Sequence, residues 1–342
     1  MVVLATGASN ALALAPTDGI HLNGFETCTL EAERMAFAGA NGDAIEGWLW
    51  RSRCAQRVAA PAVVMLHGCS GVYASQGYGP VGHVSSRFVR WARDLNDRGV
   101  HALLVDSFST RDPDDPPSTS RQDYCNARAD VVAIGATEET DRPLDALGAY
   151  AALLSIDDGA GDPLVATDRV GLIGWSHGGS AALATVERGH LGGQPFLSAQ
   201  VFYPGCGLYG AFGNPNNGTS TYVADVPIAL HIGTADTISS IVACSAHAQH
   251  SDAVQGAAMT VTTWPQAMHS FDGATCIRND AGTLVSPWTG LTYTCSGTYN
   301  GLPFTLHDWT ARVNADRLAR CGLVSALIGV EPPGCGGPLV YP

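Results

Sequence analysis

The chain has 342 residues, of which 46% are hydrophobic and 14% are charged. Its formal net charge is −13, and all 18 residues of the Lys+Arg total are arginines. This excess of acid leaves no basic stripe, which argues against a protein that binds nucleic acid or an acidic membrane surface. The hydrophobic share is ample for a core, and no apolar run is long enough to predict integral membrane association.

The N-terminal part of the chain predicts a leader followed by an antiparallel hairpin. Residues 1–16 are apolar and rich in alanine, and Ala13-Leu14-Ala15 resembles a cleavage site. Residues 1–25 are therefore either a trimmed signal segment or a flexible leader, and the two hypotheses stay open. Residues 29–37 and 44–51 alternate in polarity around Asn41-Gly42, a pattern that is typical of a hairpin.

Beyond the hairpin, short apolar runs alternate with amphipathic segments. Buried strands are expected at residues 62–66, 101–105, 170–173, 199–203, 226–232 and 259–264. Helices are expected at residues 84–98, 129–154 with a break before Pro143, 239–254 and 308–327, and one begins just after residue 176. This alternation predicts an α/β fold in which a mainly parallel sheet carries helices on both faces. We expect a single domain over residues 26–330, with loop insertions near 205–224 and 271–303, and a C-terminal tail at 331–342.

The ten cysteines favour disulfides over zinc sites, because none of them falls in a C-x-x-C pair. Cys28 and Cys54 lie almost symmetrically about the turn at residues 40–43, so a hairpin brings them together. Cysteines 276 and 295 bracket an insertion, and cysteines 321 and 335 close the tail. Elimination then pairs Cys206 with Cys244 and Cys69 with Cys125. Disulfides predict a secreted or periplasmic protein.

A G-x-S-x-G pattern, Gly174-Trp175-Ser176-His177-Gly178, lies between an apolar run and an alanine-rich helix. In a nucleophile elbow, the serine occupies a strained strand-to-helix turn that flanking side chains would obstruct. Such a turn exposes the hydroxyl and directs the helix N-terminus at a developing oxyanion. The alternative is a glycine-rich turn that contains serine by chance, and the partners of Ser176 must decide between the two.

Those partners follow in the order Ser, Asp, His that α/β-hydrolases use. Asp236 comes in a tight turn after the strand that ends at Ile232, and His269 comes in the loop after Trp264. A serine hydroxyl needs a base to take its proton, and the base needs an acid to orient it. Alternatively, Asp236 caps the next helix and His269 is a surface histidine. Histidines 67, 101 and 231 lie in or beside strands and are interpreted as structural.

An oxyanion hole requires two N–H donors. The first is expected from His177, which follows the nucleophile, and the second from Cys69 in the loop after the first buried strand. A plain glycine turn is the alternative for the Cys69 loop. Cys69 itself is interpreted as a disulfide partner and not as a nucleophile or metal ligand, since no acidic or histidine cluster surrounds it at ligand spacing.

Taken together, residues 66–71, 105–111 and 174–179, with the later Asp236 and His269, resemble the dienelactone hydrolase family of α/β-hydrolases. The resemblance covers residues 44–269 and implies a compact hydrolase, without a large cap domain, that acts on esters or lactones of small carboxylic acids. True dienelactone hydrolases carry cysteine at the elbow, so Ser176 favours a serine esterase, a serine-nucleophile member of the family. The resemblance also suggests a carboxylate-binding role for Arg111, for which an ordinary loop salt bridge is the alternative.

The sequence thus predicts a carboxylic-ester hydrolase that works through Ser176, His269 and Asp236 and requires no cofactor and no metal. The substrate would be a small-molecule or polymeric ester. Aromatic residues of the 271–303 insertion and its end are candidates for the wall of the acyl site: Trp288, Tyr293, Tyr299 and Phe304. Two alternatives remain, a serine peptidase of the prolyl-oligopeptidase type and a non-catalytic binding protein on a hydrolase scaffold.

Overall fold

A mixed sheet of eight strands forms the centre of the molecule. The computed structural model describes residues 28, 32–55, 59–73, 83–112, 122–125, 127–273, 277–278, 284–285, 298–299, 302–332 and 335–336. The sheet strands are β1 (Glu33–Ala38), β2 (Ala44–Trp50), β3 (Ala60–Leu66), β4 (His101–Asp106), β5 (Val165–Trp175), β6 (Ala199–Phe202), β9 (Ile228–Gly233) and β10 (Met259–Trp264). Their spatial order is β1-β2-β4-β3-β5-β6-β9-β10.

Six of these strands, from β4 to β10 across the sheet, run parallel to one another, as the sequence predicts for an α/β fold. The hairpin β1–β2 joins the edge in antiparallel orientation. The remaining strands are two-residue pairs outside the main sheet: β7 (Gly213–Asn214) with β8 (Thr219–Ser220), β11 (Ile277–Arg278) with β12 (Leu284–Val285), and β13 (Thr298–Tyr299) with β14 (Leu302–Pro303).

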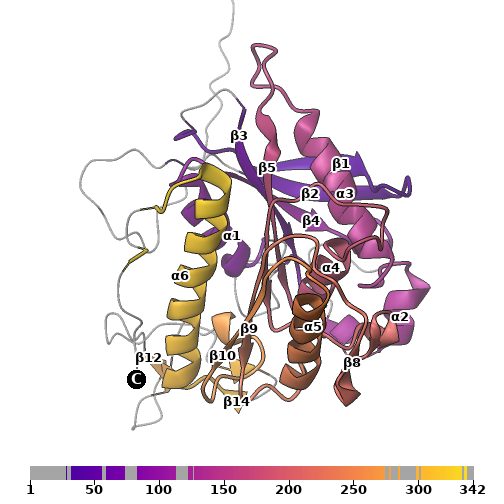
Figure 1. Cartoon of the computed structure of the whole chain (residues 1–342). Helices are drawn as coiled ribbons and strands as arrows, with labels where there is room; N and C mark the ends of the chain where they lie inside the picture. Colours follow the sequence, from indigo (N-terminus) through magenta and orange to yellow (C-terminus); the bar gives the residue numbers. More distant parts are fainter. Residues whose placement is uncertain are drawn as a thin grey trace, which may run out of the picture.

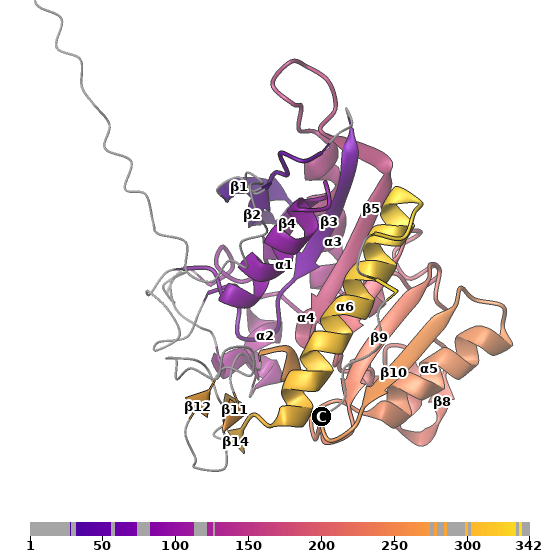
Figure 2. The same cartoon turned by 90° about the vertical axis from the view of Figure 1, so that its left-hand side faces the viewer.

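Helices cover both faces of the sheet. They are α1 (Ser86–Asn96), α2 (Arg128–Ala133), α3 (Asp141–Leu154), α4 (His177–Thr185), α5 (Ile241–Ala253) and α6 (Leu306–Ile328). Helices α1 and α6 lie on one side and α3, α4 and α5 on the other (Figure 1). A quarter turn of the molecule brings α6 in front of the sheet, where it runs alongside β5 (Figure 2). None of the helices in the described part of the chain is long and apolar enough to cross a membrane.

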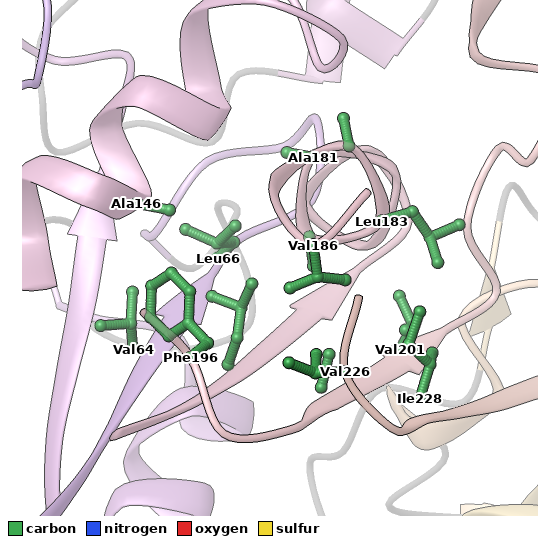
Figure 3. Close-up of a cluster of buried hydrophobic side chains, with 14 of the residues drawn as sticks. Val64, Leu66, Ala146, Ala181, Leu183, Val186, Phe196, Val201, Val226 and Ile228 are labelled. Atoms are coloured by element: carbon green, nitrogen blue, oxygen red, sulfur yellow. The ribbon is translucent and has the colours of Figure 1, made fainter. Parts of the chain in front are cut away.

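The two faces of the sheet differ in chemistry because successive side chains of a strand point to opposite sides. Val64 and Leu66 of β3 pack under α3 and α4 among aliphatic residues and Phe196 (Figure 3). Val63 and Met65, the alternate residues, pack toward α1 and α6. That second cluster holds most of the buried large aromatic rings, among them Trp50, Phe88, Trp91, Trp175, Phe202 and Trp264.

Element boundaries differ from the sequence expectation at two places. The helical region 129–154 breaks over residues 134–140, and Pro143 lies inside the first turn of α3, where a helix needs no N–H from it. Strand β5 begins at Val165, five residues before the apolar run that marks it in the sequence. The early part pairs with β3 only through Val165 and Ala60, and the register shifts between Ala60 and Ala62.

Four disulfides lie in the described residues, and they join the cysteine pairs that the sequence analysis proposed. These pairs are Cys28–Cys54, Cys69–Cys125, Cys206–Cys244 and Cys321–Cys335. The proposed fifth pair, Cys276–Cys295, lies outside the described residues. Disulfides persist where thiols are not kept reduced, so these bonds indicate an oxidising compartment.

Candidate active site

Ser176 lies on a strained turn between β5 and α4, as the elbow motif predicts. Its backbone angles, φ 51° and ψ −119°, fall in a region that side-chain-bearing residues rarely occupy. Both flanking glycines are required by close approach of backbone atoms. A Cβ on Gly174 would lie 2.1 Å from the Gly178 carbonyl oxygen, and one on Gly178 would lie 2.2 Å from the Leu66 carbonyl oxygen. The turn therefore packs backbone against backbone on β3 and lifts Ser176 above the sheet edge.

The three residues proposed as a triad form one hydrogen-bonded chain. His269 Nε2 lies 2.9 Å from Ser176 Oγ, and His269 Nδ1 lies 2.8 Å from Asp236 Oδ2. The Asp236 side chain is fully buried, and the His269 side chain is 5% exposed. The imidazole is thus placed between the hydroxyl and the carboxylate, the arrangement in which a histidine acts as a base toward serine.

The contacts of Asp236 decide which nitrogen of His269 carries the proton. A carboxylate only accepts hydrogen bonds, so His269 donates from Nδ1 and leaves Nε2 free to accept from the Ser176 hydroxyl. Asp236 Oδ1 accepts from the backbone N–H groups of Ile238 (2.8 Å) and Ser239 (2.9 Å), which fix the carboxylate. The Ser239 hydroxyl donates to the Tyr203 carbonyl at 2.7 Å and ties the β9 loop to the β6 loop.

The Asp236 turn and the loop after β10 are packed directly on each other. A Cβ on Gly233 would lie 2.0 Å from the Ala267 carbonyl oxygen, so only glycine permits this approach. Backbone hydrogen bonds run from Thr234 N to Trp264 O (2.8 Å) and from Ala235 N to Ala267 O (3.0 Å). Two loops that are more than 30 residues apart in sequence are therefore held in register by β9 and β10.

Residues 265–273, which we call the histidine loop, are held from both α1 and α6. Arg87 of α1 donates to Ser270 Oγ at 2.7 Å and pairs with the fully buried Asp272 carboxylate at 3.0 Å. Asp272 also accepts from the Tyr203 hydroxyl, and the Tyr203 ring packs edge-on against His269 at 4.6 Å. From α6, Asp308 Oδ1 accepts from Met268 N at 2.7 Å. Burial raises the pKa of Asp272, and the Arg87 charge counteracts that rise.

Residues 67–71, which we call the oxyanion loop after the role that the sequence predicts for Cys69, lie beside Ser176. A Cβ placed on Gly68 would be 3.5 Å from Ser176 Cβ. The ring of the buried His67 accepts from Ser107 N at Nε2 (3.2 Å), so it donates from Nδ1 to the Gly68 carbonyl at 2.6 Å. That bond fixes the peptide whose N–H belongs to Cys69. The Cys69–Cys125 disulfide holds the same residue from outside the sheet.

A buried polar group behind the elbow was missed by the sequence analysis. Arg142 of α3 is fully buried and contacts both the His177 ring and the His67 carbonyl. His177 Nε2 in turn lies 2.8 Å from Glu138 Oε2. The available signal was Arg142 itself, together with Asp145, on the face of α3 that otherwise carries alanine and glycine toward the core.

The other predicted residues are placed as follows. Arg111 forms a bidentate pair with the buried Asp145 (2.7 and 2.8 Å) and a salt bridge with Asp43 (2.7 Å), which is the loop salt-bridge alternative. Trp288 and Tyr293 lie outside the described residues, as does the Tyr299 side chain. Phe304 is buried. Histidines 67, 101 and 231 are buried, in agreement with a structural role.

Within the described ranges, no group of three or more His, Cys, Asp or Glu side chains is arranged to hold a metal ion. The polar side chains that converge on Ser176 are those of His269 and, through it, Asp236. An imidazole between a carboxylate and a hydroxyl can activate that hydroxyl.

Comparison with known proteins gives fold relatives only. No protein-family model matches the chain, and no curated protein matches its sequence. Among solved structures, a protein named m3DLH matches with 15% identity and a TM-score of 0.59, over 87% of this chain and 98% of that one. A dienelactone hydrolase-like promiscuous phosphotriesterase from metagenomic libraries matches with 17% identity and a TM-score of 0.53, over 87% of this chain and 99% of that one.

A structure of puromycin hydrolase matches with 15% identity and a TM-score of 0.55, over 89% of this chain but only 40% of that one. At these identities the likeness establishes the fold. The chain has the fold of dienelactone hydrolase-like α/β-hydrolases, as the motifs in its sequence suggested.

Proposed function

We propose that this protein is a serine hydrolase that cleaves carboxylic esters through an acyl-enzyme. The observation that carries the proposal is the hydrogen-bonded chain from Ser176 Oγ through the His269 ring to Asp236, with distances of 2.9 and 2.8 Å. Its support is that all three groups lie after parallel strands of one sheet and that backbone contacts fix each loop.

In the proposed reaction, His269 Nε2 takes the proton of the Ser176 hydroxyl as Oγ attacks the ester carbonyl. The negative oxygen of the tetrahedral intermediate accepts from the N–H groups of Cys69 and His177, and Asp236 stabilises the imidazolium. The intermediate then collapses: the C–O bond to the alcohol breaks, and the alkoxide leaves with the proton from His269. Water, deprotonated by the same histidine, attacks the acyl-enzyme; the bond from the acyl carbon to Oγ breaks, His269 returns the proton to Ser176 Oγ, and the carboxylic acid is released.

The test is hydrolysis of p-nitrophenyl esters by the wild type and by Ser176→Ala, with Ser155→Ala as an exposed serine control. Ser176→Ala should lower kcat by about 10⁴-fold or more, while the control retains full activity. A fluorophosphonate should modify Ser176, as located by mass spectrometry. Modification of another side chain, or equal turnover by Ser176→Ala, would contradict the proposal and favour a binding protein.

Peptide or amide hydrolysis is the second candidate, favoured by the fold similarity to puromycin hydrolase. Ser176 and His269 would serve that reaction in the same roles, because ester and amide cleavage share the tetrahedral intermediate. An aminoacyl-p-nitroanilide separates the two. Turnover of the anilide at a kcat/KM equal to or above that of the matched ester would replace esterase by peptidase.

Two further parts of the proposal concern the substrate and the compartment. Trp288 and Tyr293 are proposed to wall the acyl site, so Trp288→Ala should raise KM for aryl esters, and unchanged kinetics would remove them from it. Arg111 is left out of the substrate site because its guanidinium is committed to Asp43 and Asp145. The disulfides support a secreted or periplasmic location, which fractionation of the native host tests.

A further inference from the structure

Arg142 is a fully buried arginine that connects the nucleophile elbow to the oxyanion loop. It lies in the first turn of α3, and its side chain reaches the ends of β3 and β5. One guanidinium nitrogen, Nη1, is 2.7 Å from His177 Nδ1, and the other, Nη2, donates to the His67 carbonyl at 2.8 Å. A single planar group thus contacts both segments from which the oxyanion donors are proposed to come.

The way Arg142 is bonded is unusual for a buried charge. Its hydrogen-bond partners in the described structure are a neutral ring and a carbonyl, and the acids with the largest effect on it, Asp145 and Glu138, act through their charge and not through a hydrogen bond. Burial lowers the pKa of Arg142 to about 10, so the group stays charged at neutral pH. Burying a charge without a paired carboxylate carries a desolvation penalty, so Arg142 is expected to lower the free energy of unfolding.

The contact with Arg142 also fixes the state of the His177 ring. Arginine only donates, so His177 Nδ1 accepts and the ring proton is on Nε2, which faces Glu138 Oε2 at 2.8 Å. Burial lowers the pKa of His177, and the ring is therefore neutral. Although burial alone would raise the pKa of Glu138, His177 and Arg128 hold it below its usual value. The His177 ring thus lies between the Arg142 guanidinium and the Glu138 carboxylate.

We propose that Arg142 is the positioning residue of the oxyanion hole, an inference that rests on the proposed serine hydrolase function. The His67 carbonyl is two residues before Cys69, and His177 is the first residue of α4. By bonding to both, the guanidinium sets the separation of the two N–H donors. Its charge lies behind them in a site with little solvent screening, where it favours the negative oxygen of the intermediate.

The planar fork of arginine is essential to this role, because lysine carries one nitrogen and reaches only one of the two acceptors. We therefore compare Arg142→Lys and Arg142→Met with the wild type. Both variants should lower kcat for a p-nitrophenyl ester by roughly 10- to 100-fold, with KM changed by less than about twofold. The control is Arg320→Lys, a partly buried arginine that contacts Asp94 and Trp91 and should leave kcat unchanged.

The decisive readout is the inhibition constant of a trifluoromethyl ketone, whose bound hemiketal oxygen occupies the oxyanion hole. The inhibition constant, measured per active site as titrated with a fluorophosphonate, should rise by the same factor by which kcat/KM falls. If Arg142 only supports the fold, its variants should contain a smaller fraction of enzyme that the fluorophosphonate labels, but the active fraction should have the wild-type inhibition constant. That result would overturn the proposal.

A second pair of variants covers the case in which Arg142 variants do not fold. His177→Asn keeps an acceptor for Arg142 near the place of Nδ1 and should retain kcat within about fivefold, whereas His177→Leu should lose as much as Arg142→Met. Equal activity of His177→Leu and the wild type would overturn the proposal. The failure of the proposed function itself is distinct, because the wild type would then neither turn over esters nor be labelled at Ser176.

Discussion

The two loops that flank Ser176 are held in place by different means. The histidine loop is supported from α1 and α6 by ionic and polar contacts, Arg87 with Asp272 and Asp308 with Met268. The oxyanion loop is supported by the Cys69–Cys125 disulfide and, from the opposite face of the sheet, by Arg142 of α3. One loop thus depends on an arginine–carboxylate pair and a second carboxylate, and the other on a covalent bond and an arginine without a paired carboxylate.

This difference has a mechanistic meaning under the proposed function. The histidine loop carries the proposed base, and its support includes Asp272, a carboxylate whose pKa is raised by burial. The oxyanion loop must present N–H groups at fixed points, and the Cys69–Cys125 disulfide that holds it does not titrate. Substitutions on the α1–α6 face are therefore expected to alter proton transfer, and those on the α3–α4 face to alter stabilisation of the intermediate.

The largest expected effect comes from breaking the ionic support of the histidine loop. Arg87→Met removes the partner of the fully buried Asp272 and should lower the free energy of unfolding by about 3–5 kcal/mol at neutral pH. Without the Arg87 charge, the pKa of Asp272 in the folded state rises further above its value in the unfolded state. The variant loses stability as the pH rises from the unfolded pKa of Asp272 toward its folded pKa. Urea unfolding should therefore show a smaller deficit at pH 5 than at pH 8.

The matched control for this prediction is the double variant Arg87→Met/Asp272→Asn. It removes both charges and keeps an acceptor for the Tyr203 hydroxyl. It should recover part of the lost stability and abolish most of the pH dependence of the deficit, because asparagine does not titrate. A deficit that is the same at both pH values, or a double variant no better than the single one, would show that Asp272 is not the source.

The covalent support of the oxyanion loop is tested by Cys69→Ser/Cys125→Ser. The bond joins residues 56 apart in sequence, so its loss should cost about 2–4 kcal/mol of unfolding free energy. It should also lower kcat by roughly tenfold, because a displaced donor stabilises the intermediate less well. The control, Cys321→Ser/Cys335→Ser, removes a bond 14 residues apart in the tail and should leave kcat unchanged. Equal kcat losses in the two double variants would contradict the role of Cys69.

A smaller effect is expected at His231, which lies in β9 between the two loops. Its two ring nitrogens find no hydrogen-bond partner in the described part of the chain, and burial lowers its pKa from 6.5 to about 3. Below pH 6.5 the unfolded state binds a proton that the folded state does not. The free energy of unfolding therefore decreases as the pH is lowered. His231→Phe should raise the free energy of unfolding by about 1 kcal/mol at pH 7 and by about 2 kcal/mol more at pH 5.

The comparison variant for His231→Phe is His83→Phe, which replaces an exposed histidine. Urea unfolding at the two pH values should show no acid-dependent gain for this variant. If His231→Phe gains nothing between pH 7 and pH 5, the ring of His231 is protonated in the folded state and the assignment is wrong.

The smallest effect is expected at the start of α6. Thr305 and Asp308 form a reciprocal capping box, and Asp308 also holds Met268 of the histidine loop. Thr305→Ala should lower the free energy of unfolding by about 1 kcal/mol and leave kcat nearly unchanged, because Asp308 keeps its bond to the loop. Thr305→Ser retains the hydroxyl and should show no loss. Thermal unfolding distinguishes the two variants, and an equal loss in both would contradict the cap.

The order of the elements could be predicted from the sequence, and so could the three residues that are hydrogen-bonded in series at Ser176. Ser176, Asp236 and His269 each follow an apolar run, and parallel strands bring their carboxyl ends to one edge of the sheet. Strand β5 was predicted too short because the polar residues Thr167 to Arg169 interrupt its apolar pattern, and its early part pairs with β3 only at Val165. The hydrophobic pattern therefore did not mark them.

The supporting contacts were beyond the reach of the sequence because they depend on how helices rotate against the sheet. Arg142 meets His177 only when α3 and α4 pack with the buried face of α3 inward, and no local pattern specifies that angle. Arg87 and Asp272 are 185 residues apart and meet because α1 lies beside the histidine loop. Arg111 had two open interpretations, and its neighbours Asp43 and Asp145 distinguish them.

Backbone contacts of the nucleophile elbow fix the position of Ser176 independently of the side chains that fill the core. Gly178 touches the main chain of β3, and Gly174 touches Gly178, without an intervening side chain. The height of the hydroxyl above the sheet is consequently set by peptide units alone. Extensive exchange of aliphatic residues in the layer beneath α3 and α5 should leave the nucleophile in place, and directed-evolution libraries that aim at stability have that layer available to them.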